Sequence, residues 1–201
     1  MRMTSTRGYR MSARATSAAQ TRDRILRAVI DAAQEKLTLE IRLDDVARRA
    51  ETTVQTVLRH FGSREKLLDA AIVAGAADIA AERAVDSGDI DSGFRRLLDH
   101  YESRGDFVTR MVAQEDADAR IRSITEQGRR QHRDWVAGLF AADLAKRPEP
   151  ARTALHDLLV VTTDLATWRL LRRDRGLDRD TTEARMRALT AAVLAAPDPR
   201  E

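Results

Sequence analysis

Between residues 43 and 68 the apolar positions predict two short helices joined by a tight turn. In the first helix, apolar residues recur at positions i, i+3, i+4 and i+7: Leu43, Val46, Ala47 and Ala50. The same spacing returns after three polar residues, in Val54, Val57, Leu58 and Phe61. Each helix is therefore expected to bury one face, with the turn Glu51-Thr52-Thr53 between them.

The polar face of the second predicted helix carries side chains that can contact DNA. Two short helices joined by a turn of about three or four residues make a helix-turn-helix, whose second helix reads bases in the major groove. Gln pairs with adenine and Arg with guanine, so Gln55 and Arg59 are predicted to read bases, and Thr56 to contact a thymine methyl or a phosphate. Thr53 is expected to cap the helix, and His60 lies at the edge of its polar face. Compact helical proteins that bind no DNA also contain such pairs, so the spacing alone leaves both interpretations open.

The residues that follow make the stretch more specific. Phe61-Gly62-Ser63 ends the second helix with a glycine and starts a third with a serine cap. In this order the chain resembles the tetracycline-repressor (TetR) family, whose signature has counterparts here in Val46-Ala47, Glu51 to Thr53, Val54 to Phe61, and Ser63-Arg64-Glu65-Lys66-Leu67. The resemblance covers Thr21 to about Ala71.

This resemblance implies an all-α fold, with an N-terminal three-helix DNA-binding domain that contains the helix-turn-helix and a C-terminal helical domain for ligand binding and dimerisation. We accordingly expect a disordered basic arm over residues 1–18, the DNA-binding domain over 19–66, and the effector-binding and dimerisation domain over 67–201. A helix from Thr21 to Lys36, capped by Thr21, is expected to open the DNA-binding domain, and one from Ser63 to about Val85 to link the two halves.

Several positions depart from the family pattern. Glu51 stands where the family usually has a turn glycine, so a residue that tolerates positive φ is missing. Leu58 replaces a tyrosine that commonly contacts phosphate, and Arg42 stands where a threonine cap is common. Arg64 replaces a lysine and keeps its charge. We expect Arg22, Arg42 and Arg64 to contact DNA phosphates.

Positive charge is concentrated in the first third of the chain. Residues 1–64 contain 13 Lys and Arg against 7 Asp and Glu, a net charge of +6, whereas the whole chain carries +3. The other 137 residues are therefore net −3, and a cationic end beside an acidic body is typical of a phosphate-binding module attached to another function. The first 20 residues have four arginines and no acid. This composition predicts an arm that follows DNA or, equally, a solvated tail or a misassigned start. It also resembles an organellar transit peptide, which we discount because the DNA-binding segment follows directly.

The rest of the chain is predicted to be helical, with separate helices over residues 90–103 and from Gly105 onward. Its few large side chains lie in central helices, where they form either a packed core or the wall of an apolar pocket. Polar groups interrupt these apolar faces at His132 and at Thr163-Asp164, and could orient a ligand or satisfy neighbouring backbone groups. The candidate ligand-binding residues are Tyr101, Phe107, Met111, His132, Trp135, Asp164 and Trp168.

The last two predicted helices carry wide apolar faces. One consists of Leu155, Leu158, Leu159, Thr162, Leu165 and Ala166, and the other of Met186, Leu189, Ala192, Val193 and Ala196. In the TetR family such helices pair across a two-fold axis as a four-helix bundle, which implies a homodimer on a palindromic operator.

Other classes of function are disfavoured. The chain has no cysteine, which excludes disulfides and thiolate chemistry, and it shows no HExxH, phosphate-loop or GxSxG motif. The acids between Asp86 and Asp91 do not match a calcium-binding EF-hand, and no apolar run reaches the roughly 18 residues of a membrane helix. We therefore expect a cytoplasmic regulator that is no enzyme and has no metal or other cofactor. It is expected to bind a double-stranded DNA operator as a repressor that a small apolar effector releases. The alternatives are an effector-independent DNA-binding regulator and, less favoured, a helical-bundle enzyme.

Overall fold

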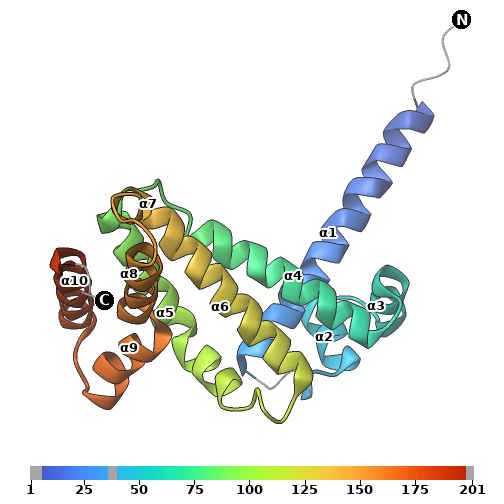
Figure 1. The fold of residues 1–201 in the computed structure, drawn as a ribbon. Helices are drawn as coiled ribbons and strands as arrows, with labels where there is room; N and C mark the ends of the chain where they lie inside the picture. The colour runs from blue at the N-terminus through green and yellow to red at the C-terminus, as the bar shows by residue number, and fades with distance from the viewer. Residues whose placement is uncertain (1–5, 36–39, 198–201) are drawn as a thin grey trace, which may run out of the picture. The chain divides into compact units, whose positions relative to one another are not determined.

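The computed structural model describes residues 6–35 and 40–197, which form helices and contain no strand (Figure 1). The all-α prediction is therefore confirmed for this part of the chain. The chain divides into two compact units, residues 1–77 and residues 78–201, and the division falls within one helix rather than at residue 66. No helix in the described ranges is both long and apolar enough to cross a membrane.

Unit 1 contains α1 (Thr6–Glu35), α2 (Leu43–Arg49), α3 (Val54–Phe61) and most of α4 (Arg64–Glu82). The apolar stripes predicted for the two short helices meet α1 and the start of α4 in one core. Its fully buried members are Ile25, Val29, Ala32, Ile41, Val46, Ala50, Val57 and Leu67. The amphipathic spacing therefore placed these helices correctly.

The expected disordered arm is helical wherever it is described. Helix α1 begins at Thr6, so residues 6–18 continue the helix that was expected to start at Thr21, and Figure 1 shows this N-terminal half running beyond α2 and α3. Thr21 is not a cap, because it lies inside the helix and its hydroxyl donates to the Ser17 carbonyl at 2.9 Å. Alanine and arginine favour helix without needing an apolar stripe, so the missing apolar period does not imply disorder here. Residues 1–5 of the arm and Lys36 lie outside the described residues.

Unit 2 is a helical bundle whose main helices pack side by side (Figure 1). Helix α5 (Ile90–Val112) lies against α6 (Ala119–Leu139), and α8 (Ala151–Thr163) lies between α6 and α10 (Arg179–Ala195). The shorter elements are α7 (Ala141–Leu144), α9 (Leu165–Arg169) and the π-helical turn η2 (Leu170–Asp174). Their core contains Phe94, Leu97, Leu98, Val136, Phe140, Leu159, Trp168 and Met186, all fully buried.

Helix α5 is continuous through Gly105, where the sequence had suggested that a new helix begins. The glycine has a packing role instead, because a Cβ atom at this position would lie 2.5 Å from Cζ3 of Trp168. The missing side chain lets the indole of α9 lie directly against α5.

Candidate functional site

The turn between α2 and α3 closes with two hydrogen bonds that tie it to the end of α2. The Glu51 N–H donates to the Arg48 carbonyl at 3.2 Å, and the Thr52 N–H donates to the Ala47 carbonyl at 2.9 Å, which is the pattern of a Schellman motif. Glu51 occupies the left-handed position of this motif with φ 50°, where glycine is usual. The turn predicted at Glu51 to Thr53 thus keeps the geometry suited to glycine, but it holds a glutamate in a conformation that L-residues disfavour.

Both ends of α3 are capped as predicted. The Thr53 hydroxyl accepts a hydrogen bond from the Thr56 N–H at 3.2 Å, which satisfies one free donor of the first turn. Gly62 ends the helix with φ 82°, and the Ser63 hydroxyl accepts from the Lys66 N–H at 3.2 Å to start α4. These caps fix where α3 begins and ends in the chain.

The outer face of α3 carries polar side chains, as expected, and one apolar residue that was not expected there. Gln55 and Arg59 are exposed, whereas Thr56 and His60 are half-buried. The apolar spacing predicts Leu58 on the buried face, but 38% of its surface is exposed. At helical spacing it lies on the same face of α3 as Gln55 and Arg59. Only Val57 and Phe61 of the predicted stripe are buried, because α3 is short and only one narrow strip faces the core.

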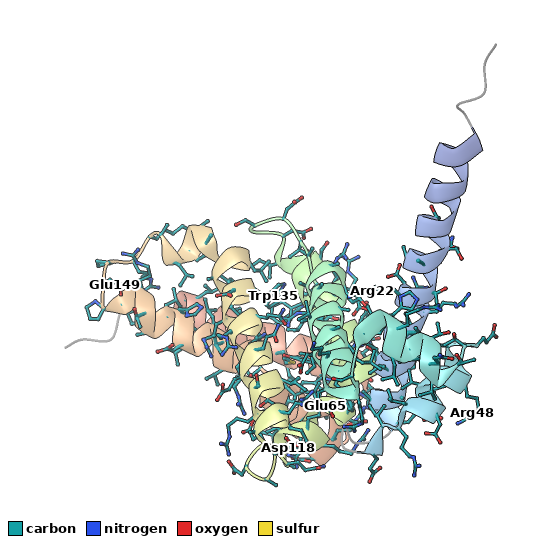
Figure 2. All side chains as sticks on the ribbon, turned by 90° about the vertical axis from the view of Figure 1, so that its right-hand side faces the viewer. Arg22, Arg48, Glu65, Asp118, Trp135 and Glu149 are labelled. Carbon is teal, nitrogen blue, oxygen red and sulfur yellow. The ribbon has the colours of Figure 1, made fainter. Side chains whose placement is uncertain are left out.

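Three arginines of unit 1, one in α1, one directly before α2 and one in α2, are further accessible basic groups. The Arg22 guanidinium of α1 lies over the Phe61 ring, 5.1 Å from its centroid, and Arg42 pairs with Asp44 at 3.4 Å while remaining exposed. Arg48 of α2 pairs with Asp45 and is largely exposed; Arg22 and Arg48 are labelled in Figure 2. The three basic side chains can therefore be reached from solvent.

Arg64 has a structural contact that the sequence did not suggest. Its Nε donates to the Ile41 carbonyl at 2.8 Å and thereby ties the start of α4 to the segment before α2. Arg49, also not singled out, bridges α2 to α1 through Glu35 at 2.6 Å and Asp45 at 3.3 Å. Its carboxylate partners, Glu35 foremost, raise the pKa of the Arg49 guanidinium. Both arginines stabilise the arrangement of the short helices.

In unit 2 the structure brings some of the ligand-binding candidates together and separates others. Tyr101 donates to the Thr163 carbonyl at 2.9 Å, and its ring lies 5.7 Å from that of Trp168. His132 stacks on Trp135 with ring centroids 5.8 Å apart. Asp164 has a capping role, because its carboxylate accepts from the Ala166 N–H at 2.8 Å at the start of α9.

Two further candidates lie farther along α5. Phe107 is half-buried and Met111 buried, both beyond Gly105, where Trp168 packs. Trp168 itself is fully buried and donates from its indole to Glu102 at 3.1 Å. Its indole nitrogen is therefore already bonded within the chain.

Arg83 is a buried charged residue of unit 2 that the sequence does not single out. It follows α4 directly, and only 6% of its surface is exposed. Its Nη2 lies 3.0 Å from Nδ1 of His132, and its guanidinium lies over the Trp135 ring at 4.5 Å. The only sequence signal was a charged residue at the end of an apolar helix, which does not stand out among 35 Lys and Arg.

The buried imidazoles of His132 and His100 are both neutral. Burial, reinforced by the charge of Arg83, lowers the pKa of each imidazole to about 3. A neutral His132 can accept from Arg83 at Nδ1 and donate from Nε2 to the Thr163 hydroxyl, 3.1 Å away. The Thr163 hydroxyl in turn donates to the Leu159 carbonyl at 2.7 Å. We call Arg83, His100, Tyr101, His132, Trp135 and Thr163 the Arg83 cluster.

In the described part of the chain, no group of three His, Asp or Glu residues could hold a metal ion. The Arg83 cluster offers hydrogen-bonding groups and aromatic rings around one cation, so the chemistry it favours is binding of a polar ligand.

The segment that contains α2, α3 and the first part of α4 matches a known family. Residues 39–71 match the model of the family described as bacterial regulatory proteins, tetR family. No curated protein and no solved structure matches the chain. The matched residues contain α2, α3 and the start of α4, with the caps and turn described above. The chain therefore carries the DNA-binding domain of the tetR family, and the protein is a DNA-binding transcriptional regulator.

Proposed function

We propose that the protein is a homodimeric, ligand-responsive repressor that binds a palindromic operator through α3. The observation that carries this proposal is the outer face of α3, where Gln55 and Arg59 are exposed between two well-formed caps. Gln55 at the start of α3 and Arg59 in its last turn both have bidentate hydrogen-bonding capacity, which suits them to reading base edges.

The remaining contacts are assigned by chemistry and position. Thr53 and Thr56 lie at the start of α3, where hydroxyls can reach a phosphate or a thymine methyl, and His60 lies at its other end. The arginines Arg22, Arg42 and Arg64 supply phosphate contacts, with Arg64 also holding α4 in place. The exposed Leu58 adds an apolar group that suits a thymine methyl.

The proposed dimer interface lies on α8 and α10. Leu155, Leu159 and Met186 are buried within the chain, but Leu158, Val161 and Leu189 are exposed by 48%, 60% and 46%. Helices α8 and α10 pack against each other, and their buried Thr190 and Thr162 hydroxyls bond at 2.9 Å. An apolar surface on two adjacent helices suits a self-complementary two-fold interface, which would present two α3 helices to two half-sites.

The ligand response is proposed to involve the Arg83 cluster and α4. Helix α4 begins beside the Ser63 cap that follows α3 and ends at Glu82, next to Arg83. A ligand that binds more tightly to the DNA-incompetent state would shift operator affinity, and a coupling of about 1–3 kcal/mol changes it about 5- to 150-fold.

The test is binding of the purified protein to DNA from upstream of its own gene, compared with a scrambled duplex, by fluorescence anisotropy across a salt series. We expect tighter binding to the upstream DNA, with two chains per site and a salt dependence set by the phosphate contacts. Equal binding to both duplexes at every salt concentration would contradict operator recognition in that region.

A companion test examines the dimer. Val161→Asp should shift the sedimentation of the free protein from dimer to monomer, because it places a charge in the apolar interface. The matched control is Val73→Asp on α4, where valine is 67% exposed and lies outside the proposed interface. Identical sedimentation of both variants would argue against an α8–α10 interface.

A further inference from the structure

Arg83 is a buried cation with few partners. It bonds through Nη2 to His132, while its Nε has no hydrogen-bond partner. Among the described residues, no carboxylate lies within ion-pair distance of its guanidinium. Burial accordingly lowers the pKa of this guanidinium, yet an arginine stays protonated at neutral pH. The cluster therefore holds a positive charge.

Three carboxylates of the neighbouring segments are bound to other groups. Glu82 pairs with Arg104 at 2.8 Å, Glu102 pairs with Arg172 at 2.9 Å, and Asp164 caps α9. Each is held by a bond of its own, so none needs to move towards Arg83. None of these three carboxylates therefore balances the charge of Arg83.

The other members of the cluster are neutral, and one of them has a buried polar atom without a hydrogen-bond partner. His132 and Tyr101 are uncharged, and Nδ1 of the buried His100 has no hydrogen-bond partner. A buried charge without a counter-ion is costly for the folded chain, and so is a buried polar atom without a partner. Such groups occur where a ligand completes the site.

We propose that unit 2 binds a small organic carboxylate, with its anionic group on Arg83 and its apolar body beside Trp135. The free Nε of Arg83 belongs to a guanidinium fork that matches a carboxylate, and the free Nδ1 of His100 is a second buried polar atom of the cluster without a partner. The half-buried Trp135 lies against Arg83, with the guanidinium over its ring at 4.5 Å and its Nε1 bonded to the Arg83 carbonyl at 3.0 Å, so the body of a carboxylate on Arg83 would lie next to this indole. A single cation among neutral groups suits one negative charge better than the two of a phosphate.

This inference rests on the proposed ligand response and names the class of effector. It also replaces a purely apolar effector by an amphipathic acid. Arg83 follows the last residue of α4, and its N–H donates to the Ile79 carbonyl of that helix at 3.1 Å. Trp135, labelled in Figure 2, comes from α6 and bonds the same residue. A carboxylate on Arg83 would therefore act directly on the end of α4.

The experiment measures thermal unfolding and tryptophan fluorescence of the full chain with three sodium carboxylates, acetate, benzoate and phenylacetate. Their amides serve as neutral counterparts, sodium phosphate is a further anion, and sodium chloride keeps the ionic strength equal. We expect at least one carboxylate to raise the unfolding temperature in a concentration-dependent way while its amide does not. Equal effects of acid and amide, an effect of phosphate alone, or no effect of any carboxylate would overturn the proposal.

Arg83→Met tests the assigned cation. It should weaken carboxylate binding about 10- to 100-fold, because a charge-assisted hydrogen bond is lost. The ligand-free variant should stay folded, because the substitution removes an uncompensated buried charge. The matched control, Arg95→Met on α5, removes an exposed arginine that bonds only Ser92 and should bind like the parent. Unchanged binding in Arg83→Met would refute the assignment. If this variant does not fold, Arg83→Lys, which keeps the charge and loses the fork, should still weaken binding.

Operator binding measured on the same samples separates the two proposals. Carboxylate binding that leaves operator affinity unchanged would keep the ligand site and contradict the ligand response. Operator binding without any carboxylate effect would keep the regulator and contradict the ligand site.

Discussion

The two units differ in where they keep their polar chemistry. In unit 1, Asp45 is the one polar or charged side chain that is buried among the described residues. Unit 2 buries a larger set, consisting of Arg83, His100, Thr125, His132, Thr162, Thr163, Thr182 and Thr190. Unit 1 thus has an apolar core with polar groups outside, whereas unit 2 has polar groups within its core.

This difference reflects the kind of partner that each unit can bind. A DNA duplex is too large to enter a domain, so its contacts belong on an outer face such as that of α3. A small ligand is bound best when it is surrounded, and its polar groups then need partners inside the protein. The free Nε of Arg83 and the free Nδ1 of His100 are the groups that the ligand proposed above would complete.

The largest effect should come from lowering the pH, which charges the histidines of unit 2. The pKa of His132 is about 3 in the folded chain and about 6.5 when unfolded, so the unfolded state binds more protons between these values. The free energy of unfolding is therefore fully retained above about pH 6.5 and falls by up to about 1.4 kcal/mol per pH unit for each such histidine below it. Tryptophan fluorescence during urea unfolding reports this unit specifically, because Trp135 and Trp168 both lie in it.

His132→Gln should reduce that pH slope, since glutamine does not titrate. Thr190→Val is the control: it breaks the buried bond to Thr162 and should lower the free energy of unfolding without changing the slope. A slope that His132→Gln leaves intact would show that the burial of this imidazole does not set the acid sensitivity of unit 2.

Two glycines of unit 2 should respond in opposite directions. Gly105→Ala would force a Cβ against the Trp168 ring and should lower the free energy of unfolding by about 1–3 kcal/mol. Gly128→Ala on α6 has open space around its Cβ and should raise it by about 0.5–1 kcal/mol through helix propensity. Urea unfolding measures both, and destabilisation by both variants would mean that the space around Gly128 is not free.

The outer face of unit 1 should separate base contacts from phosphate contacts. Arg59→Ala should weaken operator binding by about 1–3 kcal/mol and relax the base preference, whereas Arg42→Ala should weaken all sequences alike and reduce the salt slope by about one. Arg42 is the better comparison than Arg64, because Arg64 also bonds the Ile41 carbonyl. Fluorescence anisotropy on operator and scrambled DNA measures the base preference and the salt slope of each variant. Identical results for the two variants would mean that Arg59 and Arg42 do not have separate base and phosphate roles.

The smallest effect is expected at the turn of unit 1. Glu51→Gly relieves the left-handed backbone at φ 50° and should raise the free energy of unfolding by about 0.5–1 kcal/mol, since the strain removed exceeds the entropy that glycine adds to the unfolded chain. Circular dichroism during denaturation measures this change in the free energy of unfolding. Glu51→Ala is the control, because alanine keeps the strain, and equal stabilisation by both would assign the effect to the lost carboxylate.

The helix-turn-helix could be predicted closely from the sequence, whereas the Arg83 cluster could not. Spacing and capping residues gave α2, α3, the Thr53 cap and the Gly62 end, all confirmed in the structure. The sequence singles out His132 and Trp135 as a polar and an aromatic candidate, but it does not single out their common partner Arg83. The base, phosphate and ligand contacts assigned to individual residues stay predictions.

The sequence by itself determined the local features of this protein, because helix spacing, caps and turns depend on residues within about four positions of one another. Only the tertiary structure decided which side chains are buried and which meet. Arg83 and His132 are 49 positions apart, and His132 and Thr163 are 31 apart, so their bonds depend on how three helices pack. The exposure of Leu58 and the role of Gly105 have the same origin, because burial is a property of the neighbours that a fold supplies.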